Sequence, residues 1–190
     1  MTRVGFLDAL LGRSKPAPPD LDQLFGLPSA AVTLEAAAGF RPTGNGSVAF
    51  KAAEGAGFSG LREQVEGLLA LDEGRYRAET DTFGFTWLVR HTTPDDLDGL
   101  VTDLHAVNSS LVDAGFGTAL LCTLVGFSDG TRSLGLVYLY KRGSWYPFAP
   151  SGPERRDTSL ELQARSVLEQ ELRIEPDLSR WFPVYGAPGL

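Results

Sequence analysis

The sequence predicts an α+β protein in which three main helices pack on one face of an antiparallel sheet. Two observations carry this prediction. Segments with alternating apolar and polar residues occur as two pairs and one group of three, and strands joined by such short turns must run antiparallel. Segments with apolar residues at helical spacing separate these groups. We therefore expect two strand pairs and a three-stranded meander, with the other sheet face partly free for a partner.

Residues 1–19 are predicted to form a short amphipathic helix and a proline-rich tether, and residues 20–190 a single α+β domain. Residues 3–13 carry apolar side chains on a helical period with basic residues around them, and the prolines that follow stop any helix. The candidate contact residues on this helix are Phe6, Leu7, Leu10 and Leu11. The helix could dock on its own domain, on a dimer mate or on a partner helix, or lie weakly and peripherally in a membrane interface.

The next segment predicts a β-hairpin after a short helix within residues 20–27. Pro28 begins an alternating run with Val32 and Leu34 on one face, and residues 47–51 alternate as a half-buried strand would. Glycines and a proline within residues 39–46 are typical of the connecting turns. A helix is then predicted over residues 61–72, because four apolar residues form a helical stripe there.

Residues 75–81 and 83–91 predict the second strand pair, and the helix that follows extends to Gly115. Its predicted start has Thr93 as the N-cap and Pro94 at the first helical position, with acidic residues in the first turn. The meander is predicted over residues 118–125, 134–140 and 145–148, with a strong hairpin signal at Asp129-Gly130.

The last helix is predicted to begin with a capping box, Thr158-x-x-Glu161, and the chain is helical no further than Pro176. Residues 181–185 are rich in aromatic side chains, and we expect this tail to pack back on the domain.

Composition favours a folded cytoplasmic protein and disfavours nucleic acid as a partner. The chain has 190 residues and a formal net charge of −7, which opposes the phosphate neutralisation that supplies most nucleic-acid affinity. A single cysteine, Cys122, fits a reducing compartment, and its apolar surroundings predict a buried thiol. We expect neither a signal peptide nor a membrane span.

Two motifs resemble catalytic ones. Residues 55–60 match G-x-G-x-x-G between a predicted strand and a predicted helix, which leaves a nucleotide-binding enzyme as a minor alternative, although the preceding strand is not apolar on both faces. Residues 126–130 match G-x-S-x-G, but a strand rather than a helix follows Ser128, so a hairpin turn is expected. His91 and His105 have no metal-ligand spacing. We predict no catalytic, metal or cofactor site and no cofactor.

Several stretches resemble the actinobacterial family of PspA-associated proteins called PspAB. They are residues 4–13, 18–25, 27–34, 39–44, 136–143 and 145–150. The resemblance implies a non-enzymatic cytoplasmic protein of the phage-shock, or envelope-stress, response, in which the coiled-coil protein PspA guards the inner face of a stressed membrane. It implies PspA as a partner and transfers no catalytic residue to this chain.

The leading functional hypothesis is therefore a binding or adaptor protein that acts through protein–protein contacts. It would use the open sheet face, the N-terminal helix, or the aromatic residues Trp145, Tyr146 and Phe148, which form a candidate partner contact. The alternative is a client-binding dimer with the architecture of secretion chaperones, and a homodimer is a further candidate assembly.

Overall fold

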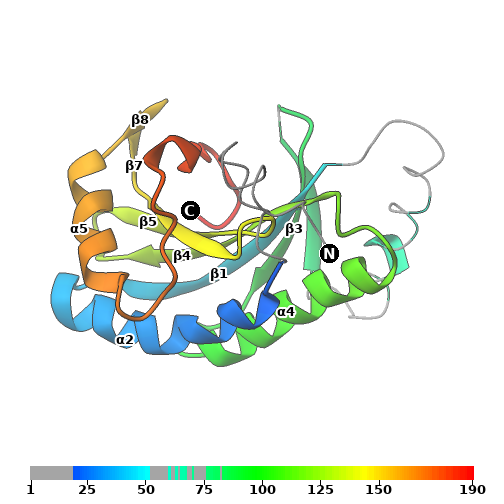
Figure 1. Cartoon of the computed structure of the whole chain (residues 1–190), viewed down its shortest axis with the longest axis horizontal. Helices are drawn as coiled ribbons and strands as arrows, with labels where there is room; N and C mark the ends of the chain where they lie inside the picture. The colour runs from blue at the N-terminus through cyan, green and yellow to red at the C-terminus, as the bar shows by residue number, and fades with distance from the viewer. Residues whose placement is uncertain are drawn as a thin grey trace, which may run out of the picture.

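A computed structural model describes residues 19–51, 60, 63, 65–67, 70, 76–81 and 83–190. Its centre is a six-stranded sheet of order β2-β3-β1-β4-β5-β6, in which every neighbouring pair is antiparallel (Figure 1). The strands are β1 (Arg41–Phe50), β2 (Tyr76–Thr80), β3 (Thr86–His91), β4 (Leu120–Ser128), β5 (Ser133–Leu139) and β6 (Ser144–Phe148). The predicted α+β class is confirmed.

Three helices lie along one side of this sheet in Figure 1: α2 (Leu27–Ala38), α4 (Leu97–Asp113) and α5 (Thr158–Leu168). Their apolar side chains join alternate residues of the strands, such as Val48 and Tyr138, in one core, which we call the helix-side core. The described residues of the segment 60–70 are also helical, and Val65 from this segment belongs to the same core. Smaller elements are the 3₁₀ helices η1 (Leu21–Gly26) and η2 (Leu178–Arg180) and the strands β7 (Pro150–Gly152) and β8 (Arg155–Arg156).

The prediction of a first strand pair was wrong, because residues 27–38 form helix α2. The buried side chains of α2 are Leu27, Ala30, Ala31 and Leu34, which is the helical spacing i, i+3, i+4, i+7. Val32, expected on the same face as Leu34, is instead 70% exposed. Pro28 lies in the first turn, where its missing N–H costs nothing, and Gly39 ends the helix in the left-handed conformation.

The predicted turn over residues 39–46 was also wrong from Arg41 onward, because β1 runs through it. Gly46 lies under α4, and a Cβ there would come within 2.7 Å of the Leu104 side chain. Glycine at position 46 therefore allows α4 to pack closely on β1 and does not mark a turn. This strand is central, since it pairs with both β3 and β4.

The hairpin of β2 and β3 and the meander of β4, β5 and β6 are confirmed, whereas both predicted helix caps were wrong. Asp96, not Thr93, caps α4 by accepting a hydrogen bond from the Gly99 N–H. Asp157, not Thr158, caps α5 in the same way through Leu160. In both cases a carboxylate that follows a turn lies next to the free amides and replaces the hydroxyl as the cap.

The C-terminal tail, residues 174–190, lies against the sheet face opposite the helices (Figure 1). Its Trp181 and Ala187 are buried with strand residues that include Trp87, Leu124 and Tyr146, in a second core that we call the tail-side core. The prediction that the tail packs back on the domain is confirmed. None of the helices in the described residues is both long and apolar enough to cross a membrane.

Candidate binding surfaces

The aromatic segment predicted as a partner contact lies inside the protein. Trp145 is fully buried in the helix-side core, and Tyr146 and Phe148 are buried in the tail-side core. These side chains cannot meet a partner in this conformation, except where the Tyr146 ring borders a pocket described below. Because β6 is an edge strand, the sequence alone could not show that another segment covers it. The tail covers this edge through the Trp145 backbone, whose N–H donates to the Arg173 carbonyl oxygen and whose carbonyl oxygen accepts from the Glu175 N–H.

Glu175 anchors the tail as a buried carboxylate. It accepts hydrogen bonds from Arg142 Nε at 3.1 Å and from Ser144 Oγ at 2.9 Å, and its side chain is 1% exposed. Burial alone would raise the pKa of Glu175, but these hydrogen bonds, with one from the Asp177 N–H, hold it below the usual value. The carboxylate is therefore charged at neutral pH, and it ties the tail to the turn between β5 and β6.

Aromatic contacts hold the next part of the tail. The Trp181 ring stacks on Tyr146 with centroids 6.1 Å apart, and Trp181 Nε1 donates to the Glu175 carbonyl oxygen. Beyond it, the Tyr146 hydroxyl donates to the Phe182 carbonyl oxygen at 2.9 Å. The end of the tail packs directly against the backbone of β4 at Gly126, where a Cβ would collide with the Gly189 carbonyl oxygen. Gly126 of the G-x-S-x-G match thus permits close approach of the tail.

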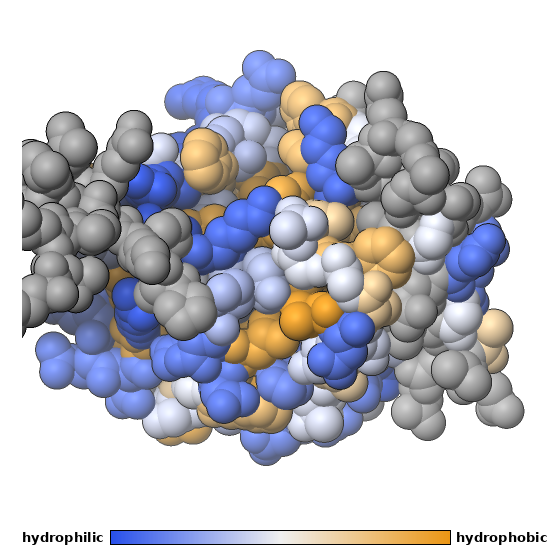
Figure 2. Space-filling model, turned by 45° about the vertical axis from the view of Figure 1, so that its right-hand side comes forward, coloured by the Kyte–Doolittle hydropathy of each residue, from blue (hydrophilic) through white to orange (hydrophobic). Residues whose placement is uncertain are grey.

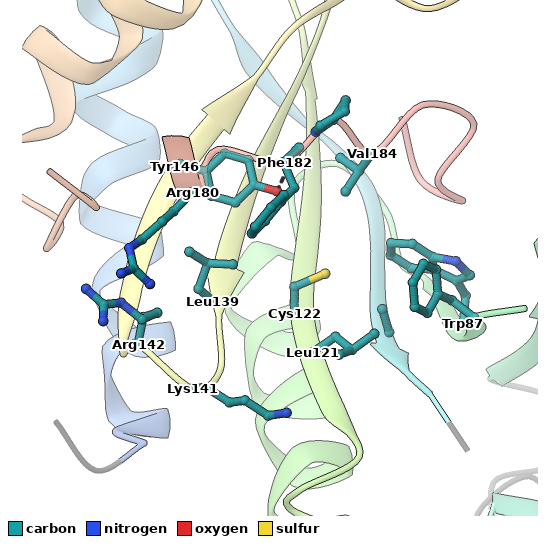
Figure 3. A pocket seen from close by; sticks show the side chains of 13 residues that line it. Trp87, Leu121, Cys122, Leu139, Lys141, Arg142, Tyr146, Arg180, Phe182 and Val184 are labelled. Carbon is teal, nitrogen blue, oxygen red and sulfur yellow. Dashed lines mark hydrogen bonds between the residues drawn. The ribbon is translucent and has the colours of Figure 1, made fainter. Parts of the chain in front are cut away.

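An apolar cavity of about 400 Å³ remains between the tail and the sheet, and we call it the sheet pocket (Figure 3). Its apolar and aromatic lining comes from β1, β3 and the turn before it, β4, β5, β6 and the tail: Ala49, Phe85, Trp87, Leu121, Cys122, Leu139, Tyr146, Phe182, Pro183 and Val184. In the space-filling view of Figure 2, apolar surface is recessed between polar side chains. This size is within the usual range of small-molecule sites, roughly 300–1,000 Å³.

The polar atoms of the pocket walls are already bonded elsewhere. Trp87 Nε1 donates to the Asp81 carboxylate at 2.9 Å, and the Tyr146 hydroxyl is held by the tail backbone (dashed line in Figure 3). Burial raises the pKa of the Cys122 thiol to about 12, so this group stays protonated and is a poor nucleophile. Among the described residues, the interior therefore offers an apolar surface and no activated nucleophile.

Among the described residues, the cationic side chains that line the pocket are Lys141, Arg142 and Arg180, which we call the cationic rim. Arg142 forms an ion pair with the buried carboxylate of Glu175. Arg180 pairs with Asp177 at 3.0 Å, and both of these side chains are almost half exposed. Lys141 forms no ion pair with any residue that the structure describes. In Figure 3 the two arginines lie at one side of the pocket and Trp87 at the other.

A second hollow, of about 570 Å³, lies between α2 and the start of α4, and we call it the α2–α4 groove. Its lining includes the exposed Val32 and three carboxylates, of which Glu35 pairs with Arg41 at 2.7 Å. Asp95 and Asp98 are exposed there. The groove thus combines an apolar helix surface with a negative border.

Comparison with known proteins places the chain in a family. The model of a family described as PspA associated protein B, or PspAB, matches residues 4–189. The chain belongs to the PspAB family. No curated protein and no solved structure matches it. The resemblance noted from the sequence stretches is therefore confirmed over nearly the whole chain, and the family description indicates association with PspA.

The other sequence candidates of this PspAB-family chain have structural explanations where the structure describes them. Ser128 is the last residue of β4, next to the turn to β5, and its hydroxyl donates to the Arg132 carbonyl oxygen and accepts from the Gly130 N–H. This confirms a hairpin turn instead of a nucleophile elbow. His91 Nδ1 lies 2.6 Å from Asn45 Oδ1 on the strand surface, and His105 packs beside the Phe25 ring.

Two predictions lie almost entirely outside the described residues. One is the N-terminal helix and tether with the contact residues Phe6, Leu7, Leu10 and Leu11, and the other is the glycine motif 55–60, of which the structure describes Gly60 alone. Among the residues that the structure does describe, no three His, Cys, Asp or Glu side chains gather as a metal site.

Proposed function

We propose that this chain is a non-enzymatic adaptor that binds PspA in the cytoplasm and takes part in the response to membrane stress. The observation that carries the proposal is the PspAB family match over residues 4–189. The protein would act through protein–protein contacts, and the membrane would be reached through PspA.

The α2–α4 groove suits a helical partner better than the sheet pocket does. An α-helix with its side chains is about 10–12 Å across, so it needs an open groove rather than a cavity that admits one narrow ligand. Val32 offers an apolar contact that is 70% exposed, and Asp95 and Asp98 would attract basic side chains beside it. We therefore propose this groove as the contact surface for a PspA helix.

Binding of purified PspA to the purified chain, measured by calorimetry, tests the proposal. Val32→Lys should weaken binding at least about tenfold, since it removes an apolar contact and repels basic residues of the partner, which together cost about 1.4 kcal/mol. Leu162→Lys on α5 is the matched control, because Leu162 is also an exposed apolar helix residue. Equal affinities of the two variants would refute the groove, and absence of any PspA binding would refute the function.

A further inference from the structure

The sheet pocket has the chemistry of a site for a single hydrocarbon chain. Its walls are apolar, and the polar atoms of Trp87 and Tyr146 already have partners in Asp81 and the tail backbone. A ligand inside it would gain from burying apolar surface and would find few hydrogen-bond partners. A nucleotide base or a sugar would lose hydrogen bonds to water on entering and is therefore disfavoured.

The cationic rim of the pocket favours a ligand with a negative charge. Lys141, Arg142 and Arg180 line the pocket, and none of the described residues that line it is a carboxylate, although the chain carries a net charge of −7. Glu175 neutralises Arg142, so the attraction comes from Lys141 and from Arg180, whose exposed pair with Asp177 is worth little. Positive charge beside an apolar cavity is complementary to an anion that carries a hydrocarbon tail.

The same charge disfavours the chain's own N-terminal segment as the occupant. Residues 3–13 carry apolar side chains, but Arg3 and Arg13 belong to the same segment and would lie against a cationic rim. A partner helix is also too broad for the cavity.

We propose that the sheet pocket binds a free, single-chain amphipathic anion, namely a fatty-acid carboxylate. The alkyl chain lies over Leu121, Cys122 and Leu139, and the carboxylate lies beside Lys141 and Arg180. The tail residue Phe182, which is 59% exposed, covers part of the bound chain. This site is separate from the α2–α4 groove and does not depend on PspA binding.

Calorimetry of the full chain with decanoate and dodecanoate, below the concentrations at which they form micelles, tests the proposal. We expect one site per chain and an affinity that rises about fourfold for each added methylene, as about 0.8 kcal/mol per buried CH₂ requires. Dodecyltrimethylammonium, which has the same tail and a cationic head, should bind more weakly. No saturable binding of dodecanoate, or equal binding of the cationic amphiphile, would overturn the proposal.

Two matched pairs of variants locate the ligand. Lys141→Glu should weaken dodecanoate binding about fivefold, because an exposed attraction becomes a repulsion of similar size, whereas Arg155→Glu on β8 should not. Phe182→Ala should also weaken it, and Phe83→Ala, another exposed phenylalanine, should not. All four residues lie at the surface, so the fold should persist. Equal effects within each pair would overturn the assignment.

Two further measurements distinguish a fatty-acid site from a membrane-binding surface and from the PspA groove. Binding of the chain to phosphatidylglycerol vesicles without binding of dodecanoate would overturn the proposal in favour of a membrane surface. Val32→Lys should leave dodecanoate affinity unchanged, so a failure of the lipid site and a failure of the PspA groove give different results.

Discussion

The two faces of the sheet are covered by different kinds of structure. On the helix side, α2, α4 and α5 cover the strands and their apolar residues form one large core. On the tail side, residues 174–190 provide little regular structure and are held by a few polar anchors, chiefly Glu175 and the Tyr146 hydroxyl. Helices cover a sheet face with side chains along their whole length, whereas a tail covers it only where it is anchored. This difference leaves the sheet pocket open.

The largest loss of stability should follow from a substitution in the helix-side core. Leu104→Ala removes a side chain that is 1% exposed and packs against Gly46 of β1, so it should lower the free energy of unfolding by about 3 kcal/mol. Urea denaturation measures this change. A loss below about 1 kcal/mol would show that this face is packed no more tightly than the other.

The second largest loss of stability should follow from a change at Glu175, which anchors the tail. Glu175→Gln leaves Arg142 without its counter-charge and should cost about 2 kcal/mol of stability at neutral pH. Because the pKa of folded Glu175 lies below its ordinary value of 4.5, the stabilisation is complete above that pH and is lost as pH falls through the folded pKa. Denaturation midpoints from pH 7 downward should therefore fall less for the variant than for the natural chain, and parallel curves would contradict this account.

A matched leucine on the tail side should matter less than Leu104. Leu139→Ala enlarges a pocket that already exists, and Leu139 is only partly buried, so we expect a loss of about 1 kcal/mol. The comparison uses the same urea experiment. If Leu139→Ala cost as much as Leu104→Ala, the pocket walls would be a packed core and the contrast between the faces would fail.

The smallest effect should come from Phe182→Ala. This side chain is 59% exposed, so stability should change by less than about 0.5 kcal/mol. The variant should nevertheless expose the pocket, and labelling of Cys122 by a thiol reagent should become faster than in Phe83→Ala. An unchanged labelling rate would show that Phe182 does not cover the pocket.

Much of the helix-side architecture could be predicted from sequence, because periodicity reports which residues a regular element buries. The places of β2, β3, β4, β5 and β6 and of α4 and α5 follow from alternating or helical patterns. One failure occurred where the same residue type serves two purposes. Gly46 was interpreted as part of a turn, yet it lies in a central strand because α4 packs closely on it.

The sequence by itself determined the α+β class, the turns of the meander and the kinship with the PspAB family. Only the tertiary structure decided that Trp145 and Phe148 are buried and that the sheet pocket has a cationic rim. The physical reason is the tail. Where an aperiodic segment packs depends on long-range contacts such as Glu175 with Arg142, and no local pattern in the chain encodes the partner of such a contact.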